Sequence, residues 1–266
     1  MTTVYVHGHH ESVLRAHRRR TAANSAGYLL PHLRPDHTLL DVGCGPGTVT
    51  VDLARHVRHV TGLDASAAVL DVARGAAADA EVTNVGFEQG DALALPFEDD
   101  SMDVVHAHQV LQHLTDPVAA LREMGRVARP GGLVAVRDAD YAAMTWYPPS
   151  PGMTEWLELY HEVTAANGVE ADAGRRLLSW ARQAGFDAER LEAGADTWCY
   201  TTPEDRAWWS GLWAERVTSS EFARQALTHA LADDVALEVV ADGWRTWGAA
   251  PDGWFAVLHG WLLVRV

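Results

Sequence analysis

Cysteine is scarce in this chain of 266 residues. Cys44 and Cys199 are its two cysteines, and they offer neither a disulfide framework nor a metal-ligand spacing. No array of Cys, His and Glu has the spacing of a metal site, although the chain opens with the histidine-rich segment 7–10. We therefore expect a reducing compartment and no bound metal.

Basic residues and long apolar runs are also few. Lys and Arg total 21 against 36 Asp and Glu, which gives a net charge of −15. Because phosphate groups bind to basic surfaces, this charge argues against nucleic acid and anionic membranes as partners. No run approaches the ~20 apolar residues of a membrane span, and the N-terminus lacks the apolar core of a signal peptide. We expect a soluble, cytoplasmic protein whose partner is a small-molecule substrate, and a homodimer stays open.

The sequence does contain a glycine-rich turn. The segment LLDVGCGPGTVT, residues 39–50, has the pattern of a buried strand, a tight turn and a helix. Gly43, Gly45 and Gly47 form a G-x-G-x-G run between the strand and the helix. Such a turn lets a ligand approach the backbone, and it presents free N–H groups at the positive end of a helix dipole. The segment is typical of a cofactor-binding loop.

Two acidic residues indicate which cofactor the loop binds. A dinucleotide loop reads G-x-G-x-x-G, whereas the third glycine here comes one residue earlier. Asp41 lies two residues before Gly43, where its carboxylate would repel a pyrophosphate and suit a cationic ligand. Asp64 ends the next apolar run, at the distance that lets a second strand present a carboxylate to ribose hydroxyls. These features favour S-adenosylmethionine (SAM) over NAD, with S-adenosylhomocysteine (SAH) as the product.

At these residues the sequence resembles the class I SAM-dependent methyltransferases, and among them the UbiE/COQ5-like small-molecule group (methyltransferase type 11). The resemblance continues through QGDALALPFEDDSMDVVHAHQVLQHLTDP (89–117) and ALREMGRVARPGGLVAV (120–136). It implies that Ala65 contacts the cofactor beside Asp64 and that Asp91 and Ala92 flank the adenine. It also implies that residues 103–114 form a strand and a loop facing the methyl group.

Strand and helix patterns alternate in the first half of the chain. This alternation predicts an α/β fold, a Rossmann-like doubly wound sheet of parallel strands. The expected strands are 38–43, 58–64, 84–90, 102–108, 132–138, 188–201 and 253–265, and the expected helices are 48–57, 67–79, 116–128, 153–167, 172–185 and 203–248, the last interrupted near 232–234. The resemblance implies a seven-stranded sheet whose last strand is antiparallel.

We predict a single methyltransferase domain over residues 1–266. Its predicted parts are an N-terminal helical arm or lid (1–35), a SAM-binding core (36–140), late strands with a helical cap inserted between them (141–252) and a final strand (253–266). The helix of the arm should run from about Glu11 to Leu33. Tyr5 or His10 would then contact the methionine end of the cofactor, and the alternative for the arm's arginines is a solvated face.

Three residues are candidates for catalysis. Methyl transfer from a sulfonium is an in-line displacement, so a general base is needed only where the nucleophile must lose a proton. His108 and His113 follow the fourth predicted strand and Asp140 follows the fifth. Ligands of such sheets bind beyond the carboxyl ends of the strands, so all three are candidate catalytic residues and His108 is also a candidate cofactor contact. The alternatives are packing for His113 and the capping of a turn for Asp140.

The tryptophans point to the acceptor. All 11 occur at or after Trp146, and Trp156, Trp180, Trp208 and Trp213 fall at helical positions. One interpretation is a packed core; the other is an aromatic wall for an apolar or aromatic acceptor. We expect a small hydrophobic metabolite to lie between the helices of 203–232 and the loop after His108, with O-, N- and C-methylation all open. A SAM-binding protein without turnover and, with weaker support, an NAD-type oxidoreductase are the alternatives.

Overall fold

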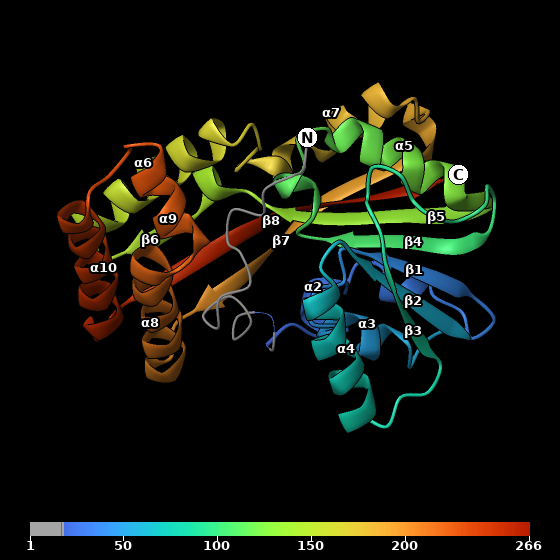
Figure 1. Ribbon diagram of the computed structural model, residues 1–266, viewed down its shortest axis with the longest axis horizontal. Helices are drawn as coiled ribbons and strands as arrows, with labels where there is room; N and C mark the ends of the chain where they lie inside the picture. Colours follow the sequence, from blue (N-terminus) through green and yellow to red (C-terminus); the bar gives the residue numbers. More distant parts are fainter. Residues whose placement is uncertain (1–16, 18) are drawn as a thin grey trace. The chain divides into compact units, whose positions relative to one another are not determined.

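The computed structural model describes residue 17 and residues 19–266 (Figure 1). The described chain divides into two compact units. The parallel-sheet unit comprises residues 17–138, 173–195 and 260–266, and the aromatic unit comprises residues 139–172 and 196–259. Strands β5, β7 and β8 each begin in one unit and end in the other.

Five strands of the parallel-sheet unit lie in the order β3-β2-β1-β4-β5. They are β1 (Thr38–Val42), β2 (His59–Asp64), β3 (Val85–Gln89), β4 (Met102–His108) and β5 (Ala128–Ala139). Every neighbouring pair is parallel. The strand order reverses at β1, which has β2 on one side and β4 on the other. This is the switch point of a doubly wound sheet, as the sequence predicted.

Helices cover both faces of this sheet (Figure 1). Helices α3 (Thr48–Leu53) and α4 (Ala67–Asp79) lie on one face, and α5 (Pro117–Val127) and α7 (Ala173–Ala184) lie on the other. Each strand side chain points to the face opposite its neighbour's, so Leu39 and Val104 belong to one hydrophobic cluster while Leu40 and Val105 belong to another. Burial on both faces explains the near-continuous apolar runs of these strands.

Local side-chain bonds set the helix ends. The Ser66 hydroxyl accepts a hydrogen bond from Val69 N and caps α4, while Asp116 caps α5 just before Pro117. Helix α3 is shorter than the predicted 48–57. The Asn84 amide donates to the carbonyls of Ala54 and Val57 at 2.8 and 3.1 Å, and these bonds stabilise a turn where the helix was expected to continue.

The expected N-terminal helix is not continuous in the described residues. Residues 22–25 form the short helix α2 (Ala22–Ser25), and a 3₁₀ turn, η1 (Leu30–His32), follows. A reciprocal capping box between Thr21 and Asn24 begins a new helix at Ala22. Pro31 has no N–H to donate, so a regular helix through it is unfavourable.

The aromatic unit contains the short turn η3 and most of the late helices. Its elements are η3 (Tyr141–Ala143), β6 (Thr145–Tyr147), α6 (Pro151–Ala166), α8 (Pro203–Ser219), α9 (Glu221–Thr228) and α10 (Asp234–Ala249), together with parts of β7 (Leu191–Tyr200) and β8 (Trp254–Arg265). The predicted helical stretch 203–248 is thus three helices. The first break is at Ser220, whose extended backbone ends α8 and whose hydroxyl caps α9.

Over the described residues the sheet has eight strands, in the order β3-β2-β1-β4-β5-β8-β6, with β7 paired to β8. Strand β6 is antiparallel to β8, with Trp146 opposite Phe255. The α/β, Rossmann-like prediction with an antiparallel end is confirmed. The additional strand, β6, has only three residues, too few to show a strand period in the sequence.

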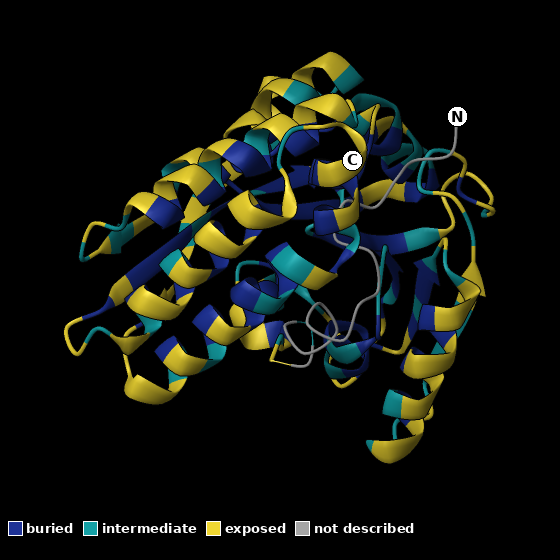
Figure 2. Cartoon of the chain, turned by 60° about the vertical axis from the view of Figure 1, so that its left-hand side comes forward, coloured by how far each residue is buried: buried dark blue, intermediate teal, exposed yellow. Residues whose placement is uncertain are grey.

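Buried residues concentrate on the strands and on the inner helix faces (Figure 2). The outer helix faces are exposed, as expected for helices that cover a sheet. Within residues 17 and 19–266, none of the helices combines the length and apolarity needed to cross a membrane.

Candidate functional site at the switch point

The glycine loop joins β1 to α3, as the sequence predicted. Gly43, Gly45 and Gly47 have φ angles of +67°, +55° and +78°, which L side chains rarely adopt. A Cβ on Gly43 would lie 2.4 Å from Val110 Cγ2, and one on Gly47 would lie 2.8 Å from Ala73 Cβ. At Gly45 the nearest heavy atom would be the His17 ring, 3.3 Å away. Gly43 and Gly47 therefore permit close packing, while Gly45 leaves backbone that a ligand can approach.

Asp64 lies at the end of β2 and is bonded to this loop. Its Oδ2 accepts a hydrogen bond from Gly45 N at 3.0 Å, and its Oδ1 accepts one from Ser66 N at 3.0 Å. Cys44 N donates to Leu63 O at 3.0 Å, so the loop follows the end of β2. The half-buried Asp64 carboxylate is therefore held beside Gly45, as a ribose-binding residue would be.

Asp41 lies beneath the loop and is only 3% exposed. Its Oδ1 is 2.7 Å from His106 Nδ1, and its Oδ2 accepts a hydrogen bond from Thr50 Oγ1 at 2.6 Å. Both oxygens thus have partners inside the protein, which join β1 to β4 and α3. The sequence reasoning did not select His106; its signal is a polar residue directly opposite Asp41 in the parallel register.

The loops after β2 and β3 contain the other predicted cofactor contacts. The Gln89 side chain donates to Ala65 O at 2.9 Å and joins the two loops. Asp91 is exposed, and its Oδ1 accepts a hydrogen bond from Leu93 N at 2.9 Å, while Ala92 is half-buried. Ala65, Asp91 and Ala92 thus follow the carboxyl ends of neighbouring strands, β2 and β3, in the same sheet as Asp64.

His108 and His113 are both 8% exposed in the parallel-sheet unit. His108 ends β4, opposite Arg137 of β5, and His113 ends the 3₁₀ turn η2 (Leu111–His113). His113 Nε2 is 3.0 Å from the Gln112 side-chain nitrogen. Because an amide nitrogen only donates, His113 Nε2 accepts this bond, and the neutral ring then carries its proton on Nδ1. The one basic nitrogen of His113 is therefore already bonded to Gln112.

Asp140 belongs to the aromatic unit and has no exposed surface. Its Oδ1 accepts a hydrogen bond from Ala143 N at 3.1 Å and caps η3, while its own N–H donates to Leu258 O at 3.0 Å. This geometry matches the turn-capping alternative, and its role in catalysis stays a prediction.

Asp138, which was not among the predicted catalytic residues, is a fully buried carboxyl near the end of β5. Its Oδ1 accepts a hydrogen bond from Gln112 N at 3.1 Å. Burial raises the pKa of Asp138 to about 7. The local sequence does not show the bond from Gln112 N, because Gln112 precedes Asp138 by 26 residues.

The N-terminal segment contacts the glycine loop and the loop after β4. Thr48 Oγ1 donates to His17 O at 3.0 Å, and Arg20 Nη2 donates to Gln109 Oε1 at 2.5 Å. Tyr5 and His10, the two predicted lid contacts, lie outside the described residues, as do the rest of residues 1–16 and residue 18 of the predicted arm. The described part of the segment therefore bridges the two loops that flank the switch point.

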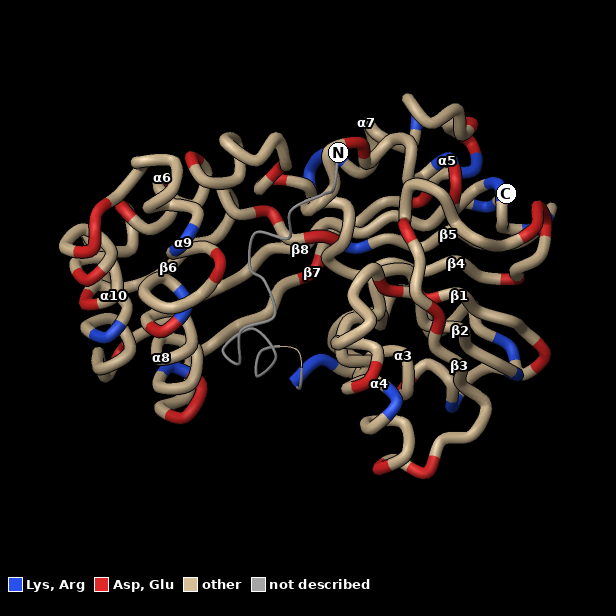
Figure 3. The backbone as a smooth tube through the Cα atoms, viewed as in Figure 1, with Lys and Arg blue, Asp and Glu red and all other residues tan. Residues whose placement is uncertain are grey.

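Charged side chains in residues 17 and 19–266 give no second candidate site. Acidic residues occur on elements of both units, including α4, α8 and α10 (Figure 3). In the part of the chain that the structure describes, no group of three or more His, Cys, Asp or Glu side chains is arranged to hold a metal ion.

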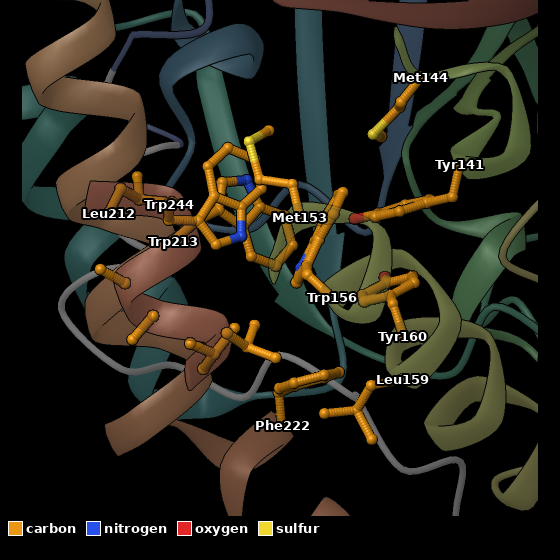
Figure 4. Packing of buried hydrophobic residues seen from close by; sticks show 14 of the residues in the cluster. Tyr141, Met144, Met153, Trp156, Leu159, Tyr160, Leu212, Trp213, Phe222 and Trp244 are labelled. Atoms are coloured by element: carbon orange, nitrogen blue, oxygen red, sulfur yellow. The ribbon is translucent and has the colours of Figure 1, made fainter. Parts of the chain in front are cut away.

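Aromatic side chains form the core of the second unit (Figure 4). Trp156 of α6 packs edge-on against Trp213 of α8 and Trp244 of α10, with ring centroids 4.7 and 4.8 Å apart. These three rings are at most 1% exposed, so they pack in a core. The half-buried Trp146, Trp198 and Trp208 border the same cluster.

Comparisons with known proteins agree with this geometry. A family model described as a methyltransferase domain matches residues 33–190. An uncharacterized methyltransferase of Schizosaccharomyces pombe is 34% identical over 270 residues, covering 98% of this chain and 96% of that protein. A demethylmenaquinone methyltransferase of Staphylococcus haemolyticus is 32% identical over 160 residues, covering 59% of this chain and 64% of that protein. The solved structure of YcgJ from Bacillus subtilis has a TM-score of 0.58 at 24% identity, covering 91% of this chain and 98% of that one.

The chain therefore belongs to the methyltransferase domain family. It is a SAM-dependent methyltransferase, and the resemblance to the UbiE-like group is confirmed.

Proposed function

We propose that this enzyme transfers a methyl group from SAM to a small, largely apolar or aromatic metabolite. The use of SAM is supported by the glycine loop at the switch point, where the Asp64 carboxylate accepts a hydrogen bond from Gly45 N. The acceptor part is supported by the half-buried Trp146, Trp198 and Trp208 of the aromatic unit, since aromatic side chains contribute large apolar contact area.

The residues present fit SAM. The glycine backbone at position 45 has no side chain to hinder a ligand, and the two oxygens of Asp64 suit a ribose diol. We assign Ala65, Asp91 and Ala92 to the adenosine end, because they follow Asp64 at the carboxyl ends of β2 and β3. Asp41 contributes indirectly. Its bonds to Thr50 and His106 join β1 to α3 and β4 beneath the glycine loop.

Bound SAM supplies the electrophilic methyl group. The protein then orients the acceptor, excludes water and, for a phenol or an acid, accepts a proton. His108, at the end of β4, is our first candidate for this base. His113 and the Asp140 carboxyl are alternatives, although His113 Nε2 would first have to release Gln112. For a carbon nucleophile these side chains would only orient the acceptor.

Two relatives support a small acceptor without identifying it. A geranyl diphosphate methyltransferase, solved with SAM, shares the fold with a TM-score of 0.53 at 19% identity. The demethylmenaquinone methyltransferase named above is a second relative whose name specifies a small molecule. We also propose that the enzyme is cytoplasmic. It should not act on nucleic acid, because its net charge of −15 opposes binding to a polyanionic phosphate backbone.

A substrate screen tests this proposal. The full chain is incubated with SAM and a panel of quinones, phenols, indoles and small acids, and mass spectrometry detects a gain of one methylene. We expect an apolar or aromatic member to be methylated. Methylation confined to nucleic acid or protein would contradict the acceptor class, and SAM binding without turnover would favour the non-catalytic alternative.

A further inference from the structure

The loop after β4 packs directly on the glycine loop. A Cβ on Gly43 would lie 2.4 and 3.2 Å from the two Val110 methyl groups, so Val110 fills the space that Gly43 leaves free. Real Cβ atoms essentially never come as close as 2.4 Å to another heavy atom, so Val110 occupies the position that a side chain at residue 43 would need. A small movement of Val110 therefore changes the contact surface of the loop. The position of residues 109–113 is thus coupled to that of the cofactor loop.

Asp138 of β5 holds this second loop. Its Oδ1 accepts a hydrogen bond from Gln112 N at 3.1 Å, and the backbone N–H groups of Leu111 and Val110 also face its carboxyl group. These are the first N–H groups of η2, which have no partner within the turn itself. One side chain therefore fixes the backbone on which Val110 is placed.

Burial of the Asp138 carboxyl group costs folding free energy. The residue has no exposed surface, and its Oδ2 is buried without a hydrogen-bond partner. Burial of a carboxyl with one oxygen unsatisfied opposes folding. An apolar side chain would avoid this cost but would leave Gln112 N without its acceptor, so the value of the aspartate lies in holding the backbone of η2.

We propose that Asp138 is a positioning residue for SAM, which acts by holding Val110 against Gly43. This inference rests on the proposed role of the glycine loop in cofactor binding. Asp138 does not contact the cofactor in this account; its effect passes through the backbone of η2 and the Val110 side chain.

Protonation offers a way to observe this role. Burial raises the pKa of Asp138 to about 7, although the bonds from Gln112 and Leu111 and the charge of Arg137 oppose the rise. The neighbouring elements also hold charged or titratable groups: Asp103, His106 and His108 on β4, His113 on η2, Arg122, Glu123 and Arg126 on α5, Arg175, Arg176 and Arg182 on α7, and His259 and Arg265 on β8. Ionisation of Asp138 makes its bonds to the loop charge-assisted and stronger. The loop should therefore be held more firmly as the pH rises through 7.

The test is titration of the full chain with SAH, in wild type and in Asp138→Asn, at about pH 6 and about pH 8. Asparagine resembles the protonated aspartate, so the two proteins should bind SAH equally at the lower pH. At the higher pH, wild type should bind several-fold more tightly. Asp138→Ala, which also removes the acceptor oxygen, should lose about tenfold or more at both pH values.

Asp103→Asn is the matched control. Asp103 is also buried and accepts hydrogen bonds from Thr38 N and Oγ1 at 2.7 and 2.8 Å, but it lies near the opposite end of β4. Asp103→Asn should destabilise the fold without changing the pH dependence of SAH affinity relative to wild type. If Asp103→Asn shows the same pH-dependent loss of SAH affinity, general destabilisation explains the Asp138→Asn result and the proposal is overturned.

The remaining outcomes separate this inference from the proposed function. If wild type does not bind SAH, the cofactor site itself is refuted. If wild type binds SAH and the wild-type to Asp138→Asn affinity ratio is constant with pH, only the positioning role of Asp138 is refuted. Should Asp138→Ala fail to fold, the asparagine variant still decides, once circular dichroism shows it to be folded.

Discussion

His106 Nδ1 lies 2.7 Å from Asp41 Oδ1 in the interior of the sheet, directly beneath the glycine loop. The bond joins β4 to β1, and Thr50 Oγ1 joins the same carboxylate to α3 at 2.6 Å. Three elements that meet at the switch point are therefore connected through one buried acidic side chain. The glycines that we assign to the cofactor begin two residues after Asp41.

Removal of the Thr50 hydroxyl tests this connection. Thr50→Val keeps the shape of the side chain and leaves Asp41 Oδ2 buried without its partner, which should cost about 1–3 kcal/mol of unfolding free energy. SAM affinity should fall as well, because α3 begins at the glycine loop. Urea denaturation and calorimetric titration measure the two effects. Thr61→Val, on neighbouring β2, is the control and should alter neither by a comparable amount.

Loss of the Asp64 carboxylate tests the ribose assignment. Asp64→Ala removes the acceptor that we assign to two ribose hydroxyls and that also bonds Gly45 N. SAM binding should weaken by ~2–4 kcal/mol. Asp71→Ala, an exposed carboxylate on α4, should leave affinity unchanged. Wild-type affinity in Asp64→Ala would refute the assignment.

Alanine substitution at two glycines with nearly equal φ angles distinguishes the steric cost of an added Cβ from the cost of its backbone conformation. Gly47 and Gly131 have φ of +78° and +79°, but only at Gly47 would an added Cβ collide, 2.8 Å from Ala73 Cβ. Gly131→Ala should cost about 1 kcal/mol for its backbone conformation. Gly47→Ala should cost roughly 1–3 kcal/mol more, as overpacking does. Equal losses on thermal denaturation would show that the Gly47–Ala73 contact can relax.

The stability of the Asp138→Asn variant should depend on pH in a defined direction. The pKa of Asp138 in the folded chain is about 7, above the 3.8 of a free carboxyl. The contribution of this group to stability is therefore complete below pH 3.8 and is lost as the pH rises to about 7. Asparagine does not titrate, so the unfolding free energy of wild type should fall relative to that of the variant, by at most about 4 kcal/mol. A difference that is constant with pH would contradict the burial of Asp138.

The tryptophans should divide into two functional groups. Trp244→Ala should cost about 3–5 kcal/mol of unfolding free energy, because Trp244 is fully buried. Trp208→Ala should cost less, since Trp208 is half-buried, and should instead change which members of the acceptor panel are methylated. Thermal denaturation and the mass-spectrometric screen distinguish these effects. An unchanged acceptor profile in a folded Trp208→Ala enzyme would remove Trp208 from the acceptor site.

The sequence predicted the parallel core well because its signals are local. Helix α4 and strand β4 have the expected bounds, since Ser66 caps the helix and Val104, Val105 and Ala107 give the strand its apolar residues. The continuous N-terminal helix was wrong, although the capping box of Thr21 and Asn24 was legible in the sequence.

Side-chain partners from distant elements were harder to predict. A strand pattern places Asp41 in β1 but does not show that His106 and Thr50 would engage both of its oxygens. Likewise, Asp138 accepts a hydrogen bond from Gln112 N of η2, which precedes it by 26 residues. Such contacts follow from the assembled fold and not from any local period.

The most direct test of the central claim is a competition in one reaction mixture. SAM with a deuterium-labelled methyl group is added to the full chain together with small apolar acceptors, transfer RNA, DNA and a mixed protein fraction, and the label is located by mass spectrometry. We predict that the label appears in a small apolar or aromatic compound and that Asp64→Ala strongly reduces this transfer. Label found only in nucleic acid or protein, or transfer that is equal in Asp64→Ala, would contradict the account.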